Sequence, residues 1–411
     1  MYNCICGYAL GVRMALLEGG RNHRKRKHKN MKHPLVAWIT LGLTLSAIDT
    51  AVSAQAEQKD AARLWGSLEY LYMTRKGSGL PPLVTSSPPG HNGVMGTSPS
   101  ILFGNERVND DWNSGFRVTL GGWIDNEQKV GVIGRFFNLG DESQRFSMSS
   151  DAGGTPLLAR PFHNADLNVN AEDALIVTSP GLRNGAVSDE ASNHIFGGDL
   201  MLSYNWMSTE NLRIDFVGGY QFTRIDDDLS MHSGMVEMGG VLPPDTRIAI
   251  GDKFDVQNDF HGIPVGLMIE FERGPWVISA LGKIGLGAMH QSVSIHGSTS
   301  VTLPGGGTTT HSGGLFAQPT NSGTHTRNEF AWVPELGFSV GYQITPNCSV
   351  TLGYGAMYWS NVALAGNQVD RTVNSSQLMG GTPAGPRRPA ASIHDTSYWV
   401  HGVQIGATFR F

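Results

Sequence analysis

The chain has 411 residues, 53 of them glycine, with 40% hydrophobic and only 16% charged residues. The first 56 residues hold 8 of the 30 basic and 2 of the 35 acidic residues, so the remainder carries a formal charge of −11. A nucleic-acid partner is therefore not expected, because phosphate binding needs a basic face. The glycine content and low charge favour a single all-β domain rich in turns.

The N-terminal region has the three parts of an export signal. A basic run from Arg21 to Lys32 precedes an apolar segment from Pro34 to Ile48, and small residues follow, with cleavage expected after Ala54 or Ala56. The apolar segment is 15 residues long, whereas a membrane-spanning helix needs about 20. We expect residues 1–30 to be a basic leader extension or a start assigned too early, 31–56 a cleavable signal peptide, and 57–411 the exported domain.

The exported domain shows ten segments in which apolar and polar residues alternate at every second position, the pattern of a strand with two different faces. They are residues 64–73, 116–125, 129–138, 196–205, 212–223, 259–271, 276–290, 330–344, 348–359 and 398–411. Connections of three to six residues alternate strictly with connections of more than thirty. Tight periplasmic turns and long outer loops alternate in this way in a transmembrane barrel. The fold predicted is an antiparallel outer-membrane β-barrel of ten strands, with twelve as the alternative count.

Tryptophan placement favours the same fold. Four tryptophans lie beside the short connections and three beside the long ones, so they are predicted to form two interfacial belts. They are Trp65, Trp123, Trp206 and Trp276 on the short side and Trp332, Trp359 and Trp399 on the long side. The alternative is that tryptophan packs in a soluble core. The long connections are predicted to be mobile surface or to fold into the barrel mouth.

The last segment places an apolar residue at every second position and ends on an aromatic residue. This set is Val403, Ile405, Ala407, Phe409 and Phe411. It resembles the signal that hands outer-membrane barrels to their assembly machinery. The partners it implies are that machinery and outer-membrane lipid.

Several blocks, in order along the exported domain, resemble the family of outer-membrane barrels called putative beta-barrel porin 7. The blocks are 64–72, 79–85, 158–163, 218–222 followed by 226–229, 254–260, 333–336 and 366–374. The segment Ala363-Leu364-Ala365 departs from the family pattern, which has a basic residue there. The resemblance implies an outer-membrane location and a porin-like function, and it brings no catalytic residues.

Alternation predicts that five charged residues face the lumen: Arg117, Arg213, Asp215, Lys283 and Glu335. Charges inside a small barrel either pair with one another or filter solutes. Both interpretations stay open from the sequence.

Other motifs offer little chemistry. Residues 337–341 match the G-x-S-x-G expression of hydrolases, but strand alternation continues through Ser339, whereas the motif needs a strand-to-helix turn. The acidic run Asp226-Asp227-Asp228 suits solvated rim charge better than a divalent cation site, since no full ligand loop follows. The histidines lack the spacing of zinc ligands. No metal, no cofactor and no enzymatic activity are predicted.

Two functions from different classes remain. One is a narrow passive channel for small solutes, although a barrel of ten strands lies close to the size that side chains fill. The other is a structural or adhesive barrel whose long surface loops bind other molecules. An outer-membrane hydrolase is the weakest alternative.

Overall fold

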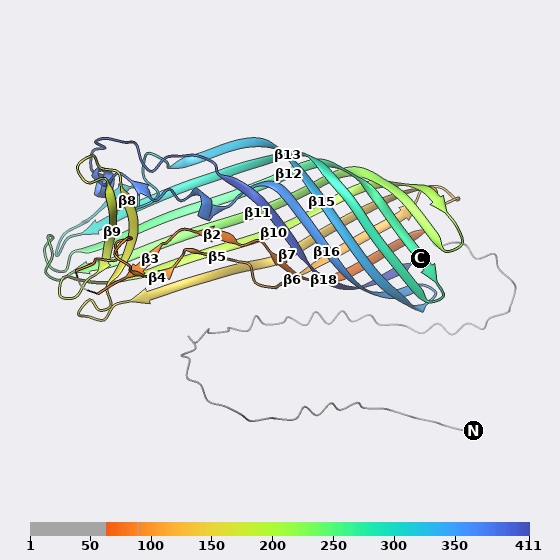
Figure 1. Cartoon of the computed structure of the whole chain (residues 1–411), viewed down its shortest axis with the longest axis horizontal. Helices are drawn as coiled ribbons and strands as arrows, with labels where there is room; N and C mark the ends of the chain where they lie inside the picture. The colour runs from red at the N-terminus through yellow and green to blue at the C-terminus, as the bar shows by residue number, and fades with distance from the viewer. Residues whose placement is uncertain (1–62, 89) are drawn as a thin grey trace, which may run out of the picture. The chain divides into compact units, whose positions relative to one another are not determined.

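The computed structural model describes residues 63–88 and 90–411, and the predicted signal peptide with its cleavage sites lies outside them. Ten long strands form a closed antiparallel barrel (Figure 1). In chain order they are β1 (Leu64–Arg75), β6 (Asn113–Trp123), β7 (Val130–Ser149), β10 (Arg183–Ser208), β11 (Leu212–Glu237), β12 (Arg247–Arg273), β13 (Trp276–Thr302), β15 (Gly323–Thr345), β16 (Cys348–Ala363) and β18 (Asp395–Arg410). Each pairs with the next, and β18 pairs with β1. The predicted ten-stranded barrel is confirmed.

The connections divide by length between the two ends of the barrel. Residues 124–129, 209–211, 274–275 and 346–347 form short turns at the end where the C-terminus lies (Figure 1). The remaining connections lie at the opposite end. Short turns mark the periplasmic side of such barrels, so the opposite end is extracellular.

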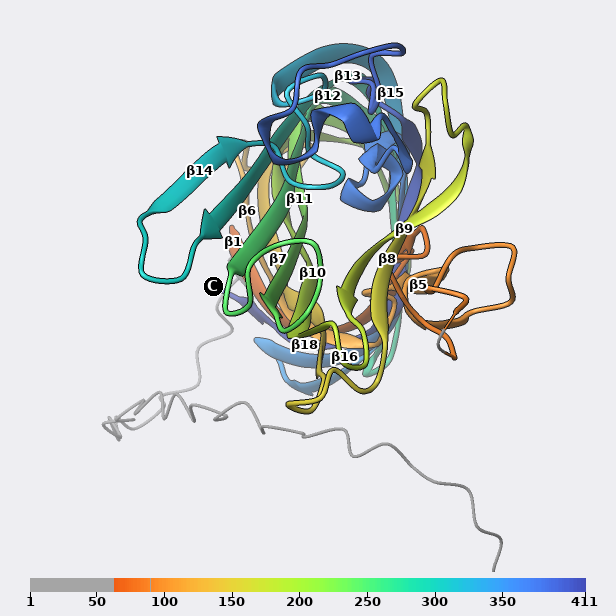
Figure 2. The same cartoon turned by 90° about the vertical axis from the view of Figure 1, so that its left-hand side faces the viewer.

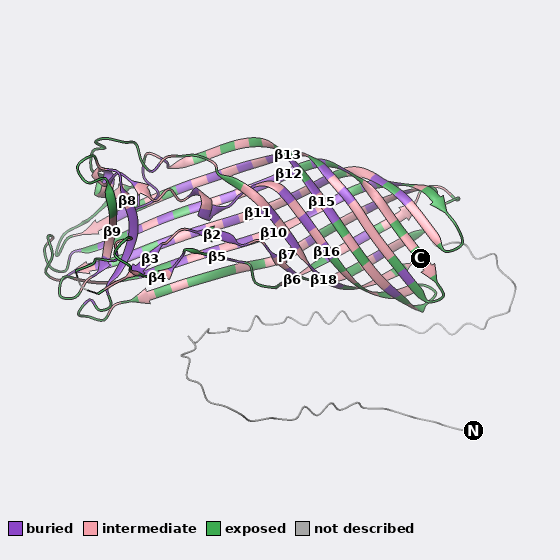
Figure 3. Cartoon of the chain, viewed as in Figure 1, coloured by how far each residue is buried: buried purple, intermediate pink, exposed green. Residues whose placement is uncertain are grey.

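Side chains alternate between lipid and lumen with the period of two that the sequence predicts (Figure 3). On β11 the outward residues Phe216 and Tyr220 are 46% and 50% exposed, while Val217 between them is buried. The outward apolar run on this strand extends from Leu212 to Phe222, the length that crosses a membrane, about 9–11 residues. From Arg224 onward the outward positions are polar. The belt of outward apolar residues therefore marks the membrane-spanning part.

Three tryptophans predicted to lie in the interfacial belts point inward instead. Trp359 is fully buried inside the barrel, Trp65 packs against an apolar cluster in the lumen, and the Trp123 ring lies 4.1 Å from the Arg213 guanidinium carbon. On their strands they are in phase with lumen residues, and phase rather than position along the strand decides the facing. Trp206, Trp276 and Trp332 lie on the outward face as predicted.

Five strands continue far beyond the membrane and form an extracellular sheet, here called the extension. Strand β7 has 20 residues, β10 and β11 have 26 each, and β12 and β13 have 27 each. Much of the predicted long connections at 139–195, 224–258 and 291–329 is therefore strand, and only residues 238–246 connect β11 to β12. The expected loops were wrong here because the polarity of the alternation reverses: the outward face is polar and the inward face apolar.

Smaller elements pack on the inner face of the extension. A five-stranded sheet combines β3 (Val84–Ser86), β4 (Ser100–Phe103), β8 (Leu158–Asn164), β9 (Ala171–Thr178) and β17 (Thr372–Val373). Strands β2 (Ser78–Leu80) and β5 (Glu106–Val108) also pair with each other. Strand β14 (Thr308–Ser312) lies outside this inner group, because it pairs with β13 and its residues are mostly exposed. Two short 3-10 helices, η1 (Ala365–Gln368) and η2 (Ser375–Gly380), complete the group.

Figure 2 shows these elements from the extracellular end. They share an apolar core with the extension. Leu158 and Phe162 of β8 belong to the same buried cluster as Leu229 of β11 and Phe254 of β12. Part of the long connections thus folds into the barrel mouth, one of the two predicted alternatives. The described part of the chain contains no helix long and apolar enough to cross a membrane.

The C-terminal residue joins the last strand to the first. The Phe411 amide donates to the Leu64 carbonyl at 2.8 Å, while the Phe411 side chain is 72% exposed. We predict that Phe411→Ala, which keeps these main-chain bonds, lowers the yield of heat-modifiable folded protein on gels. The test compares it with Leu352→Ala, another exposed lipid-facing change. Equal yields would mean that the aromatic ring gives no assembly signal.

Candidate functional site

Three of the five residues predicted to face the lumen meet in one cluster at the middle of the membrane-spanning part. The Lys283 ammonium lies 3.0 Å from the Glu335 carboxylate, and an Arg117 nitrogen lies 4.0 Å from the other oxygen of that carboxylate. All three side chains are buried; Lys283 and Glu335 are each 4% exposed. The charges pair with one another, which was one of the two interpretations.

Two partners in this cluster were missed in the sequence. Arg135 on β7 donates to Glu335 at 2.9 Å, and Asp199 on β10 accepts from the Lys283 ammonium at 2.6 Å. Arg135 also donates to Asp199 through its Nε at 2.9 Å. Both residues lie in predicted strands, in phase with inward neighbours, so strand phase was the signal that could have found them. With Glu69, which lies 3.6 Å from Arg117, the cluster balances three cations with three carboxylates.

The other two predicted lumen residues form a separate group near the short turns. Arg213 donates to the Asp215 carboxylate at 2.8 Å and to the Gln128 carbonyl at 2.7 Å. Asn205 also donates to Asp215, at 2.7 Å. These contacts join β10, β11 and the connection from β6 to β7 at the periplasmic end.

Apolar layers lie on both sides of the charge cluster. On the periplasmic side Ile133, Met201 and Val217 are buried together. On the extracellular side a larger buried group includes Leu71, Phe137, Phe260, Met289, Trp359 and Tyr398. Protein interiors packed in this way leave few spaces larger than a water molecule. The described side chains that face the lumen are thus buried in alternating apolar and charged layers.

Three buried carboxylates on the inner wall hold the segments that fold into the mouth. Asp189 pairs with Arg160 of β8 at 2.6 Å, and Asp227 accepts from the Ala365 amide at 2.7 Å. Asp252 accepts from the amide of Ala317 at 2.7 Å, and from two preceding amides. Burial raises the pKa of Asp227 and Asp252 to about 6. The three residues of the acidic run at 226–228 do not share one face of the sheet: Asp227 faces inward, and Asp226 and Asp228 face outward.

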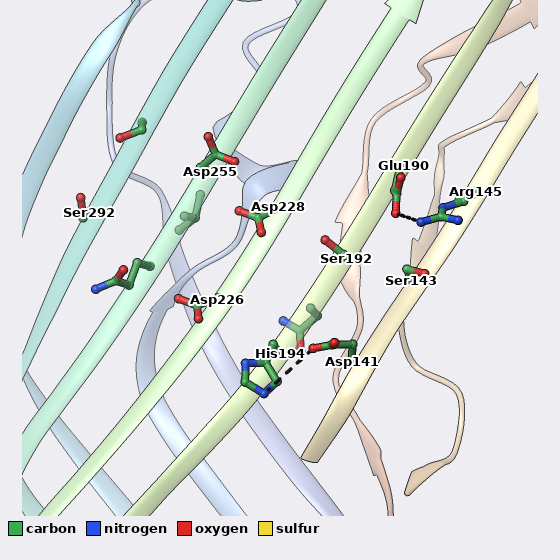
Figure 4. Close-up of a pocket in the computed structure, with 14 residues that line it drawn as sticks. Asp141, Ser143, Arg145, Glu190, Ser192, His194, Asp226, Asp228, Asp255 and Ser292 are labelled. Carbon is green, nitrogen blue, oxygen red and sulfur yellow. Dashed lines mark hydrogen bonds and ion pairs between the residues drawn. The ribbon is translucent and has the colours of Figure 1, made fainter. Parts of the chain in front are cut away.

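The outward face of the extension is hollowed into a pocket of about 650 Å³ (Figure 4). It spans β7, β10, β11, β12 and β13, above the lipid belt. The pocket is lined by Asp141, Ser143, Arg145, Glu190, Ser192, Asn193, His194, Asp226, Asp228, Asp255, Val256, Gln257, Ser292 and Ser294. Because these residues stand on paired strands, sheet register fixes their relative positions.

Register arranges the pocket in rows across the strands. One row runs through Ser143, Ser192, Asp228, Asp255 and Ser294, and the adjacent row through His194, Asp226, Gln257 and Ser292. At one edge the Arg145 guanidinium donates to Glu190 at 2.6 Å. The pocket therefore has carboxylates at its centre and hydroxyl groups on both sides.

Two carboxyl groups face each other directly in this pocket. Asp228 and Asp255 are cross-strand partners. Burial, and then the nearby Asp255 charge, raises the pKa of Asp228 to about 7. Burial also raises the pKa of Asp226. Like charges opposite each other destabilise a sheet, so this pairing costs folding free energy.

The remaining motifs do not assemble into a site. Ser339 lies in the middle of β15, paired with Ser279 and Gly353 on straight neighbouring strands rather than on a turn. Among residues 63–88 and 90–411, no group of three or more His, Cys, Asp or Glu residues has an arrangement that could hold a metal ion.

A closed antiparallel barrel with a lipid-facing apolar belt defines an outer-membrane β-barrel protein. The family model Putative beta barrel porin-7 (BBP7) matches residues 65–411, and the chain belongs to this family. No curated protein matches the chain significantly.

Solved structures with some likeness include other outer-membrane proteins. The outer membrane protease OmpT from Escherichia coli is 10% identical, with a TM-score of 0.38 over 85% of this chain and 97% of that chain. A Pseudomonas aeruginosa FadL homologue is 10% identical, with a TM-score of 0.26 over 86% and 91%. The toluene transporter TodX of P. putida is 8% identical, with a TM-score of 0.19 over 85% and 90%. At these values the likeness does not extend to activity or ligand.

Proposed function

We propose that this protein is a closed outer-membrane barrel that works outside the membrane, where the pocket on its extension binds other molecules. The observation that carries the proposal is the contrast between two faces of the same strands. Inside, the lumen is filled with buried layers; outside, the extension holds an accessible pocket lined by polar side chains. Binding pockets are concave and built on rigid elements, and this one lies on five paired strands.

The passive channel is the competing function. In its favour stand the porin name of the family and the charges in the lumen. Against it, Lys283 and Glu335 are almost fully buried and bonded to each other and to Asp199 and Arg135. A solute would have to separate these pairs, and breaking a buried pair by removing one partner costs about 3–5 kcal/mol.

Conductance separates the two functions. The purified folded protein, inserted into a planar lipid bilayer, is expected to give no stepwise current, and a known porin inserted into the same bilayer serves as the positive control. Steps of reproducible size from this protein would overturn the proposal. Such current steps would indicate that the charge cluster selects solutes.

The proposal assigns no catalysis to the chain. In the pocket the His194 ring lies 3.2 Å from the Asn138 amide nitrogen and 4.0 Å from the Asp141 carboxylate. A nucleophile needs a base within hydrogen-bond reach. The carboxylate could orient the ring as a base, but neither of these two partners is a hydroxyl or thiol that the ring could activate.

A further inference from the structure

We infer that the pocket on the extension binds a small organic cation that carries several primary ammonium groups. The inference rests on the proposed function, because it names the class of ligand for the same pocket. Polyamines and amino-sugar oligomers share this chemistry.

The charges that line the pocket are distributed rather than gathered at one point. Asp141, Asp226 and Asp228 stand on β7 and β11, and Asp255 stands on β12. Neighbouring strands lie about 4.8 Å apart, so the carboxylates are spread along the pocket. Of the pocket's acidic side chains, Glu190 has an arginine partner within the pocket, Arg145. The centre is therefore acidic, which favours a cation whose charges are spaced along a chain.

The size and the uncharged lining fit an organic ligand better than a bare ion. The volume of about 650 Å³ lies within the range of sites for drug-sized ligands, about 300–1,000 Å³. Ser192, Ser292 and Ser294 lie beside the carboxylates in the rows described above. Their hydroxyl groups can donate and accept hydrogen bonds. A metal ion is not favoured, since the described acidic residues and histidines form no group suited to one.

Repulsion between the opposed carboxyl groups of Asp228 and Asp255 favours the binding of positive charge in the pocket. Without a ligand, a proton relieves the repulsion between these two carboxyl groups, as the raised pKa of Asp228 reflects. An ammonium group between them can replace that proton and donate a hydrogen bond to each carboxylate. Binding should therefore release protons near neutral pH.

Other charged groups around Asp228 act on the same equilibrium. They are Glu190 and His194 on β10, Asp226 and the inward Asp227 on β11, and Lys253 with Asp255 on β12. The Lys253 ammonium lies 2.6 Å from the Asp255 carboxylate and neutralises part of its negative charge. The β13 side of the pocket contributes the uncharged Ser292 and Ser294.

Calorimetric titration of the full folded barrel in detergent micelles tests the inference with three probes. Spermidine and the trimer of glucosamine carry ammonium groups, and the trimer of N-acetylglucosamine has the sugar framework without the charge. We expect both cations to bind and the neutral trimer to bind at least tenfold more weakly than the glucosamine trimer. Binding of the glucosamine trimer alone would assign the site to amino sugars, and comparable binding of spermidine would assign it to ammonium charge.

Matched variants locate the binding. Asp228→Asn is expected to weaken spermidine binding at least tenfold at pH 8. Asp245→Asn, on the exposed connection from β11 to β12, removes the same charge and is expected to leave spermidine binding unchanged. Asp255→Asn serves as the second pocket variant if the first fails to fold. Equal weakening by Asp245→Asn would mean that the overall negative charge of the protein, and not the pocket, attracts the cation, which would overturn the inference. Absence of cation binding would also overturn it.

The pH dependence provides an independent reading. With a pKa of about 7 at Asp228, spermidine affinity should rise about tenfold from pH 6 to pH 8, because spermidine stays protonated over this range. His194→Gln should keep this rise, and Asp228→Asn should abolish it. The failure of this inference is distinguishable from failure of the proposed function: a barrel that gives no current and binds only the neutral trimer keeps its binding role and loses the cation. A conducting barrel loses the proposed function whatever it binds.

Discussion

Glu335→Ala is expected to lower the free energy of unfolding by about 3–5 kcal/mol. The change removes the carboxylate that bonds Arg135 and Lys283 and lies near Arg117, and leaves these buried cations with too little negative charge. An uncompensated buried charge costs more than the pair contributes to stability. Urea titration of the protein refolded into lipid vesicles, followed by tryptophan fluorescence and by gel mobility, measures the loss.

Glu329→Ala, on the same strand, is the matched control. Its carboxylate lies 3.2 Å from Arg327 with both side chains partly exposed, and an exposed pair of this kind contributes about 0–1 kcal/mol. Combining Glu335→Ala with Lys283→Met should recover part of the loss, because the pair is removed together. Similar small losses for both single variants would indicate that water reaches the cluster, and the lumen would then have to be open.

Phe216→Arg should cost about 2–4 kcal/mol in the same titration. Phe216 lies on the outward face of β11 within the apolar belt, where an arginine would meet lipid hydrocarbon. His232→Arg provides the comparison, since His232 lies on the outward face of the same strand but in the extension. An exposed surface change of this kind is expected to stay within about 0.5 kcal/mol. Equal losses at the two sites would mean that the membrane boundary assigned to β11 is wrong.

The transmembrane part of the fold could be predicted because lipid imposes a strong pattern. The membrane-level strands place mostly apolar residues at alternate, outward positions, as Leu352 and Phe338 show. The barrel closes because unpaired main-chain groups are costly in hydrocarbon, and this closure needs no particular side chain. The number of strands and the alternation of short and long connections came from these two rules.

The extension was missed because its pattern has the opposite sign. Outward positions such as Ser192 and Ser294 are polar, and inward ones such as Leu229 are apolar, so a search for lipid-facing strands does not recognise them. The pocket depends on register across five strands, which places Asp228 opposite Asp255. That pairing joins residues far apart in the sequence, and no local motif specifies it.

The inner-wall carboxylates also constrain the order in which the protein can mature. Asp227 bonds to Ala365, which is 138 residues away, whereas Asp189 bonds to Arg160, which is 29 residues away. The first contact forms more slowly than the second, because a longer intervening chain must first be confined. Until residue 365 has crossed to the outer side, the apolar inner face of the extension lacks part of its cover. We therefore expect the extracellular core to consolidate after the membrane strands insert, and the chain to be most exposed to proteolysis between these two steps.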